Sequence, residues 1–104
     1  MPDFMFAYHG GKMPESEEEG ARMMAAWEAW YTELGDNVVH PGNPVGMSKT
    51  VSAKSVTDDG GANPLSGFTI VRAADIDAAC KMAARCPMVA DGSGTAEVAP
   101  IVEM

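Results

Sequence analysis

The first third of the chain holds a short apolar run followed by a helical repeat. The run Phe4–Tyr8 is rich in aromatic residues and ended by Gly10 and Gly11, which predicts a strand buried on both faces rather than a helix. Ser16 and Glu19 then form a capping box, which predicts the start of a helix. This helix carries apolar residues at helical spacing, namely Met23, Trp27, Trp30 and Leu34, with Met24 and Tyr31 beside them. We interpret the Trp and Met stripe as core or dimer interface rather than as a cofactor-binding surface.

Residues after this helix are less regular. Gly35 predicts the end of the helix, because glycine readily adopts the left-handed conformation found there. Residues 36–47 contain two valines and then a stretch rich in proline and glycine, which excludes a central strand and predicts an ordered loop. The alternating pattern of residues 48–53 predicts the second strand, which Val56 continues past a kink.

The second half repeats the order of strand and helix. A turn at residues 58–61 precedes a third strand at residues 67–72, whose two faces alternate. Asp75 is a capping residue for a second helix with a small-residue, apolar side, and Pro87 ends that helix. Residues 96–102 predict the last strand.

The predicted order is strand, helix, strand, strand, helix, strand. Two such β-α-β halves predict an α+β chain with the ferredoxin-like fold, in which four antiparallel strands carry both helices on one face. The other face then needs a cover, and a second copy of the chain is the simplest one. A length of 104 residues predicts one domain, residues 1–104. Pro100, near the end of the last strand, places that strand at an edge or marks its end.

Composition narrows the partners. The formal net charge is -8, and such a surface repels phosphate backbones and anionic lipid, so nucleic-acid and membrane partners are not expected. Part of the acid lies in the run Glu15–Glu19, which we interpret as a solvated helix start rather than an acidic recognition tail. No apolar stretch approaches the roughly 20 residues of a membrane span, and no signal peptide is expected at residues 1–9. Cys80 and Cys86, placed on one helix, lie too far apart to bridge, which predicts a reducing compartment, the cytoplasm.

The candidate catalytic residues are few. His9 and His40 are the histidines of the chain, and imidazole is the natural general base near neutral pH. His9 directly follows the first strand, where strand ends commonly open onto a pocket. Asp59 lies in a tight turn, from which a carboxylate can orient an imidazole and stabilise its charged form. The alternatives remain a packed or surface histidine and ordinary turn chemistry for Asp59.

Other polar residues near the same loop are candidates for ligand binding. They are His40, Ser48, Lys49, Asn63 and Ser66. Lys49 has the charge to hold an anionic ligand, or it is a solvated strand residue. Neither histidines at helical spacing nor paired cysteines at short spacing occur, and phosphate-binding glycine motifs are absent. We therefore expect no metal and no cofactor.

Several short motifs resemble one known family when taken together. They are Gly42-Asn43-Pro44, Ser48-Lys49-Thr50-Val51, Asp58-Asp59-Gly60-Gly61, Asn63-Pro64-Leu65-Ser66-Gly67, Cys86-Pro87 and Glu97-Val98-Ala99-Pro100. In order and spacing they resemble the YCII-related family, which includes the DGPF-domain proteins. The resemblance covers nearly the whole chain. It implies a dimeric α/β barrel, formed by two ferredoxin-like subunits packed sheet to sheet.

The resemblance also implies acid-base chemistry by a His-Asp pair in a cleft, and some relatives look like lyases. The chain departs from the pattern in two places. Many members have Asp-Gly-Pro-Phe where this chain has Asp59-Gly60-Gly61 before Asn63-Pro64. The position after Cys86-Pro87, often histidine in relatives, is Met88, which puts a mechanism through that histidine in doubt.

These observations give two functional hypotheses. In the first, a homodimer acts on a small organic molecule by metal-independent proton transfer, as a lyase or isomerase would. His9 is the base and Asp59 its orienting partner in this hypothesis, and Lys49 and Asn63 position the ligand. In the second, the dimer is a non-catalytic protein that binds a metabolite or another protein.

Overall fold

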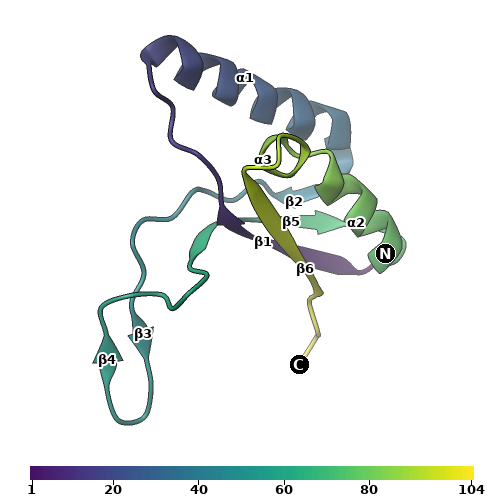
Figure 1. Ribbon diagram of the computed structural model, residues 1–104. Coiled ribbons are helices and arrows are strands. Elements are labelled where there is room, and N and C mark those ends of the chain that lie inside the picture. The colour runs from purple at the N-terminus through teal and green to yellow at the C-terminus, as the bar shows by residue number, and fades with distance from the viewer.

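The computed structural model describes residues 1–104 and contains a four-stranded antiparallel sheet with a separate small hairpin (Figure 1). Along the chain the elements are β1 (Asp3–Gly10), α1 (Glu17–Leu34), a 3-10 turn (Gly35–Asn37), β2 (Val38–His40), β3 (Thr50–Val51), β4 (Val56–Thr57), β5 (Leu65–Arg72), α2 (Ile76–Ala84), α3 (Pro87–Ala90) and β6 (Gly94–Pro100). The main sheet has the order β2-β5-β1-β6, and each neighbouring pair is antiparallel. This is the ferredoxin-like order, so the predicted fold is confirmed.

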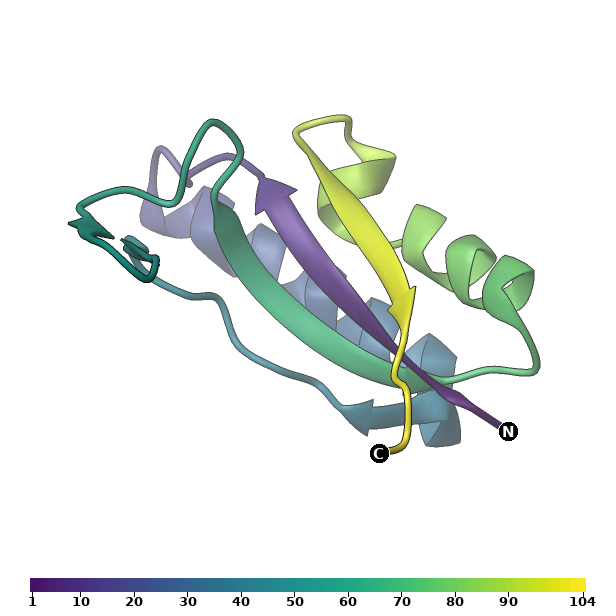
Figure 2. The same ribbon diagram turned by 90° about the horizontal axis from the view of Figure 1, so that it is seen from below.

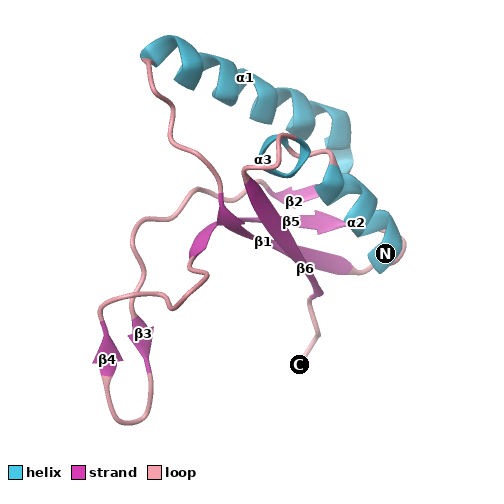
Figure 3. Ribbon diagram, in the orientation of Figure 1, coloured by secondary structure: helices cyan, strands magenta, loops and turns pink.

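All helices lie on one side of the sheet. Figure 1 shows α1, α2 and α3 above the sheet, and Figure 3 shows the same separation of helices from strands. Figure 2, seen from below, looks onto the opposite side, which no helix covers. We call this side the open face.

The core lies between the sheet and the helices. Phe4, Phe6 and Tyr8 alternate along β1 and are all buried there. Trp30 of α1 packs on Phe6 with ring centroids 6.2 Å apart, and its Nε1 donates a hydrogen bond to the Met82 carbonyl of α2 at 3.0 Å. Each such large apolar side chain stabilises the fold by about 1.5–3 kcal/mol when fully buried. The aromatic stripe therefore joins both helices to the sheet.

The start and end of α1 follow the sequence prediction. The Ser16 hydroxyl accepts a hydrogen bond from the Glu19 amide at 3.0 Å, and Glu19 Oε2 accepts one from the Glu15 amide at 3.3 Å. Gly35 has a φ of 56° at the other end, where a residue with a Cβ would be strained. The Ser16 cap and the glycine stop are thus confirmed, whereas the Glu19 side chain bonds the amide of Glu15 rather than that of Ser16, so the capping box is only half formed.

Two strand predictions need correction. The second strand of the sheet is Val38–His40, which pairs with β5, and not residues 48–53. The 3-10 turn directly precedes Val38, which lies at the edge of the sheet and packs against the core. The prolines that follow end the strand. Of residues 48–53, only Thr50 and Val51 form a strand, and they pair with β4 alone. The first strand was also predicted to be buried on both faces, but Met5 is exposed on the open face.

The C-terminal third matches the prediction more closely. Asp75 caps α2 by accepting a hydrogen bond from the Ala78 amide at 2.8 Å, as predicted. Pro87 follows the end of α2 but also begins the short helix α3, a position where proline needs no N–H partner. The last strand, β6, lies at an edge of the sheet, as Pro100 indicated.

A hairpin projects from the sheet between β2 and β5. We call residues 46–62, which include β3 and β4, the arm. Figure 1 shows the arm leaving the sheet on the side opposite the helices, the side on which the C-terminal end also lies. Every arm residue except Ser48 and Gly60 is exposed. No helix of the chain is both long and apolar enough to cross a membrane.

Candidate functional site

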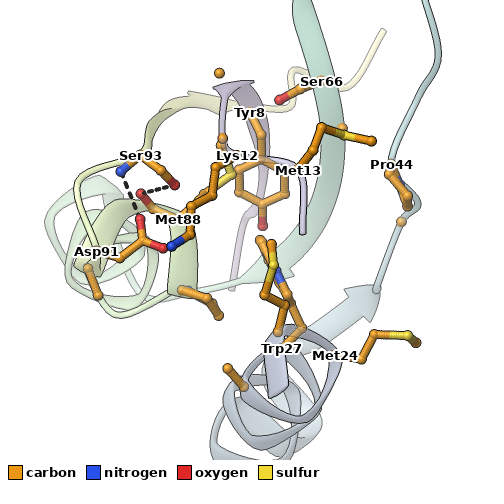
Figure 4. Close-up of a pocket in the computed structure, with 18 of the residues that line it drawn as sticks. Tyr8, Lys12, Met13, Met24, Trp27, Pro44, Ser66, Met88, Asp91 and Ser93 are labelled. Atoms are coloured by element: carbon orange, nitrogen blue, oxygen red, sulfur yellow. Dashed lines mark hydrogen bonds between the residues drawn. The ribbon is translucent and has the colours of Figure 1, made fainter. Parts of the chain in front are cut away.

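A cleft of about 1140 Å³ lies between α1 and the sheet. Its walls come from β1, the loop after β1, α1, the segment before the arm, β5 and α3. Figure 4 shows Tyr8, Lys12 and Met88 on one side of it, and Trp27 and Met24 of α1 on the other. The volume lies slightly above the range of 300–1,000 Å³ common for small-molecule sites.

The walls of the cleft are mainly aromatic and thioether groups. Trp27 packs edge-on against Tyr8 with ring centroids 5.3 Å apart, and Tyr31 lies 6.1 Å from Trp27. Met24 and Met88 add polarizable sulfur groups to the lining, and such side chains adapt to ligands of different shape. Part of the helix stripe that the sequence assigned to core or dimer interface thus lines the cleft.

A chain of hydroxyl groups fixes the aromatic side. The Tyr8 hydroxyl donates to Thr69 Oγ1 at 2.8 Å, and the Thr69 hydroxyl donates to the Pro41 carbonyl at 2.9 Å. The Tyr31 hydroxyl donates to the same carbonyl at 3.1 Å. Burial raises the pKa of the Tyr8 phenol well above its ordinary value, since desolvation outweighs the hydrogen bond with Thr69. Tyr8 therefore stays neutral and serves as a fixed aromatic wall.

Charged groups lie at the rim of the cleft. Lys12 Nζ is 3.6 Å from Glu19 Oε1, and Asp91 lies on the α3 side. The Ser93 side chain, and then the Ser93 backbone N–H at 2.7 Å, lower the pKa of the Asp91 carboxyl. Asp91 is therefore an ionised acceptor near neutral pH, and Lys12 brings a partly exposed ammonium group. A ligand with a polar edge meets both signs of charge here.

Glycines allow the segment before the arm to approach β5 closely. Gly42 has a φ of 74°, and a side chain at this position would collide with the carbonyl of Phe68. The Pro41 carbonyl, next to it, thereby reaches Thr69 and Tyr31. Gly42 and Phe68 both line the cleft, so this contact fixes part of its wall.

The predicted site residues do not gather in one place. Ser66 lines the cleft, and its role in ligand binding stays a prediction. His40 is exposed; its ring lies 5.7 Å from that of Phe68, and its Nδ1 accepts a hydrogen bond from the Gly42 amide at 2.9 Å. Lys49 is on the arm and pairs with Asp58 at 3.3 Å. The Ser48 hydroxyl, also on the arm, is buried without a hydrogen-bond partner.

His9 contacts a different carboxylate from the one expected. Its Nε2 lies 3.1 Å from Glu97 Oε1 of β6, and its Nδ1 lies 2.9 Å from the Asn63 carbonyl oxygen. The Asp59 carboxylate instead accepts a hydrogen bond from the Gly61 amide at 3.0 Å, within its own turn. The structure thus brings His9 together with Asn63 and Glu97, and not with Asp59.

Sequence reasoning missed three of these residues. Lys12 and Asp91 were not among the candidates. Glu97 stood in one of the motifs that carry the family resemblance, but nothing near it in sequence pointed to His9, because their pairing depends on β6 lying beside β1. The alternation of β1 offered one clue: if Tyr8 faces the helices, His9 faces the other way.

The fold and cleft define the chain as a ferredoxin-like α+β protein with a pocket between helix and sheet. The model of the YCII-related domain matches residues 4–104, so the chain belongs to the YCII-related family. A search of curated proteins gives no match.

A solved structure shares the fold: 5-chloro-2-hydroxyhydroquinone dehydrochlorinase (TftG) from Burkholderia phenoliruptrix AC1100, in complex with 2,5-dihydroxybenzoquinone. The TM-score is 0.55 and the sequence identity is 19%, over 93% of this chain and 90% of that chain.

Proposed function

We propose that this protein binds a small, planar organic molecule in the cleft between α1 and the sheet. The observation that carries the proposal is the cleft itself, with Tyr8 and Trp27 at its centre and Lys12 and Asp91 at its rim. Flat aromatic walls favour a flat ligand by stacking. The enzyme with the same fold was solved with a dihydroxybenzoquinone, which makes hydroxylated quinones and hydroquinones the first class to test.

Fluorescence titration tests this binding. Trp27 lines the cleft, so adding 2,5-dihydroxybenzoquinone or hydroquinone should quench the tryptophan fluorescence, and the quenching should reach saturation. Met24→Glu places a charge on the apolar wall and should weaken binding roughly tenfold, since losing the apolar contact of one side chain costs about 1.5 kcal/mol. Met47→Glu is the matched control, because Met47 is an exposed methionine on the arm. Equal affinities of the two variants would place the ligand elsewhere.

A second, separate proposal is that His9 transfers a proton on a molecule of this class bound at the open face, because the pleat of β1 turns His9 away from the cleft. The Asn63 carbonyl oxygen accepts only, so it holds His9 in the tautomer with a proton on Nδ1. Nε2 is then the atom that takes a proton from a substrate that displaces the Glu97 carboxylate from it, and Glu97, still nearby, stabilises the resulting imidazolium. In this proposal the Asn63 carbonyl has the orienting role that the sequence gave to Asp59. No metal takes part.

Exchange of a ring C–H of 2,5-dihydroxybenzoquinone for deuterium, followed by NMR, tests the proton transfer. The wild type should accelerate the exchange, and His9→Gln should abolish the acceleration. His40→Gln provides the control, since it removes the other histidine and leaves the His9 contacts in place. An unchanged rate in His9→Gln would remove the enzymatic proposal and leave a binding protein.

We also propose that the protein is a homodimer with the open faces packed together. Apolar side chains are exposed there and on the segment after β6, namely Met5, Val39, Leu65 and Ile101. Removing such a surface from water is favourable by about 25 cal/mol per Å². The size of the particle in sedimentation equilibrium tests this directly.

We further propose a cytoplasmic location, which the state of the two cysteines supports. Cys80 and Cys86 are both free thiols. Free thiols persist in reducing compartments, where disulfides are rare. Fractionation of cells that express the tagged protein is the test.

A further inference from the structure

The arm, residues 46–62, has no core of its own. None of its residues belongs to the hydrophobic core, and Val51 and Val56, opposite each other in β3 and β4, are 74% and 60% exposed. Each strand of the hairpin is only two residues long. An isolated two-stranded hairpin is marginally stable at best in water. The arm therefore needs a surface to pack against.

The base of the arm is nevertheless tied firmly to the sheet. The Val45 amide donates to the Ser66 carbonyl at 3.0 Å, and the Phe68 amide donates to the Asn43 carbonyl at 3.3 Å. On the other side, His9 holds the Asn63 carbonyl. These contacts fix the direction in which the arm leaves the body. In Figure 1 that direction is away from the helices, on the side of the open face.

The chain exposes more surface than a compact protein of its mass. The accessible surface is 7133 Å², whereas a compact monomer of this mass exposes about 5600 Å². The Cα radius of gyration is 14.8 Å, against about 13 Å for a compact domain of this length. A standard protein interface buries about 800 Å² per partner. The excess of about 1500 Å² therefore exceeds one partner's share of a standard interface and suits a larger, obligate one.

The position of the arm favours a copy of the same chain as the partner. The arm leaves the body on the side of the open face, so a copy that covers the open face also lies beside the arm. Lys54 lies in the turn of the arm and forms no ion pair within the chain, whereas Lys49 is paired with Asp58. Lys54 is therefore free to pair with a carboxylate of the second copy, which offsets part of the repulsion between two chains of net charge -8.

We propose that the arm packs along the side of a second copy of this chain, and that arm and open face form one continuous interface. The inference rests on the homodimer proposed above. In a two-fold arrangement, each arm flanks the other copy's sheet, and the exposed Val51 and Val56 become buried. The partner of the arm is thus a second copy rather than a different protein or a peptide.

Neutral substitutions test the arm without adding charge. Val51→Ser combined with Val56→Ser should raise the dimer dissociation constant at least tenfold in sedimentation equilibrium. Ile76→Ser is the matched control: Ile76 is also exposed but lies at the start of α2, on the helix side, and should leave the constant unchanged. Circular dichroism of each variant shows whether the fold is kept. An equally tight dimer in the double variant overturns the inference.

Trypsin gives a second readout that needs no variant. Cleavage after Lys54 should slow at least tenfold as the protein concentration rises through the dimer range, because the partner covers the arm. Cleavage at a constant rate across that range overturns the inference even where a dimer forms, and leaves the open-face dimer standing. A wild type that is monomeric at micromolar concentration overturns both the arm contact and the homodimer proposed above. Loss of ligand binding in the cleft affects neither of these two proposals.

Discussion

The Nε2 atom of His9 lies 3.1 Å from Glu97 Oε1, on the face of the sheet opposite to the cleft. The other ring nitrogen faces the carbonyl oxygens of Asn63 and Pro64, at 2.9 Å and 3.3 Å. The side chain of His9 thus joins β1, β6 and the base of the arm through contacts of both ring nitrogens.

A double-mutant cycle measures this link. His9→Gln, Glu97→Gln and the double variant should give a coupling energy of about 0.5–1 kcal/mol, since Glu97 is 70% exposed and solvent screens the pair. The coupling should fall in 1 M salt. The pair Glu18–Arg22 on the surface of α1 is the control, with an expected coupling of about 0.3 kcal/mol. A coupling for His9 and Glu97 no larger than that of the control would mean that the two groups are merely adjacent.

The two cysteines should differ sharply in reactivity. Cys80 is exposed, whereas Cys86 is buried, and burial raises the pKa of the Cys86 thiol. Because the thiolate is the reactive form, iodoacetamide should modify Cys80 in the native protein and Cys86 only after denaturation. Mass spectrometry of peptides at pH 8 checks this. Equal labelling of both cysteines would show that the start of α3, where Cys86 is buried, opens readily to solvent.

The strongest sequence patterns predicted the fold because they are local. The capping box at Ser16, the glycine stop at Gly35 and the cap at Asp75 each depend on residues within one turn. The second strand was wrong because its pairing is not local. Val38 joins the sheet through contact with β5, more than 25 residues further on, while residues 48–53 alternate as a strand should but find a partner only in β4.

The site was harder to predict than the fold for the same reason. His9 and Ser66 are near one another along the sheet, yet the pleat of β1 turns His9 away from the cleft, and only Ser66 lines it. Asp59 was chosen because it lies in a conspicuous turn, and turn chemistry is what its carboxylate performs here. Lys12 meets Glu19 only because the loop after β1 returns to α1. No spacing along the chain encodes these contacts.

Acid should weaken the turn beside the cleft. The pKa of Asp91 is lowered by the Ser93 side chain and amide, so its charged form is favoured in the folded state. Its stabilising contribution is therefore present above its ordinary value near 3.8 and is lost as the pH falls through the lower folded pKa. We expect Asp91→Asn to lower the melting temperature at pH 7 and to have a smaller effect at pH 2. Glu103→Gln, which removes an exposed carboxylate outside every helix and strand, is the control. A difference from the wild type that is equal at both pH values would exclude a role for the charge.

Two glycines close to each other in sequence should respond oppositely to alanine. Gly42 has a φ of 74°, and a Cβ there would collide with the backbone carbonyl of Phe68, whereas a Cβ on Gly46 meets no atom within 4 Å. Gly42→Ala should lower the free energy of unfolding by about 2–3 kcal/mol, because both the backbone conformation and the contact are strained. Gly46→Ala should be neutral or stabilising by up to about 1 kcal/mol, since it only restricts the unfolded chain. Urea denaturation of the two variants measures both effects.

Because Gly42 lies beside the Pro41 carbonyl that accepts hydrogen bonds from Thr69 and Tyr31, Gly42→Ala should also weaken ligand binding in the cleft. A Gly42→Ala protein as stable as the wild type would show that the segment before the arm moves away from β5 without cost, so that this part of the cleft wall is not fixed.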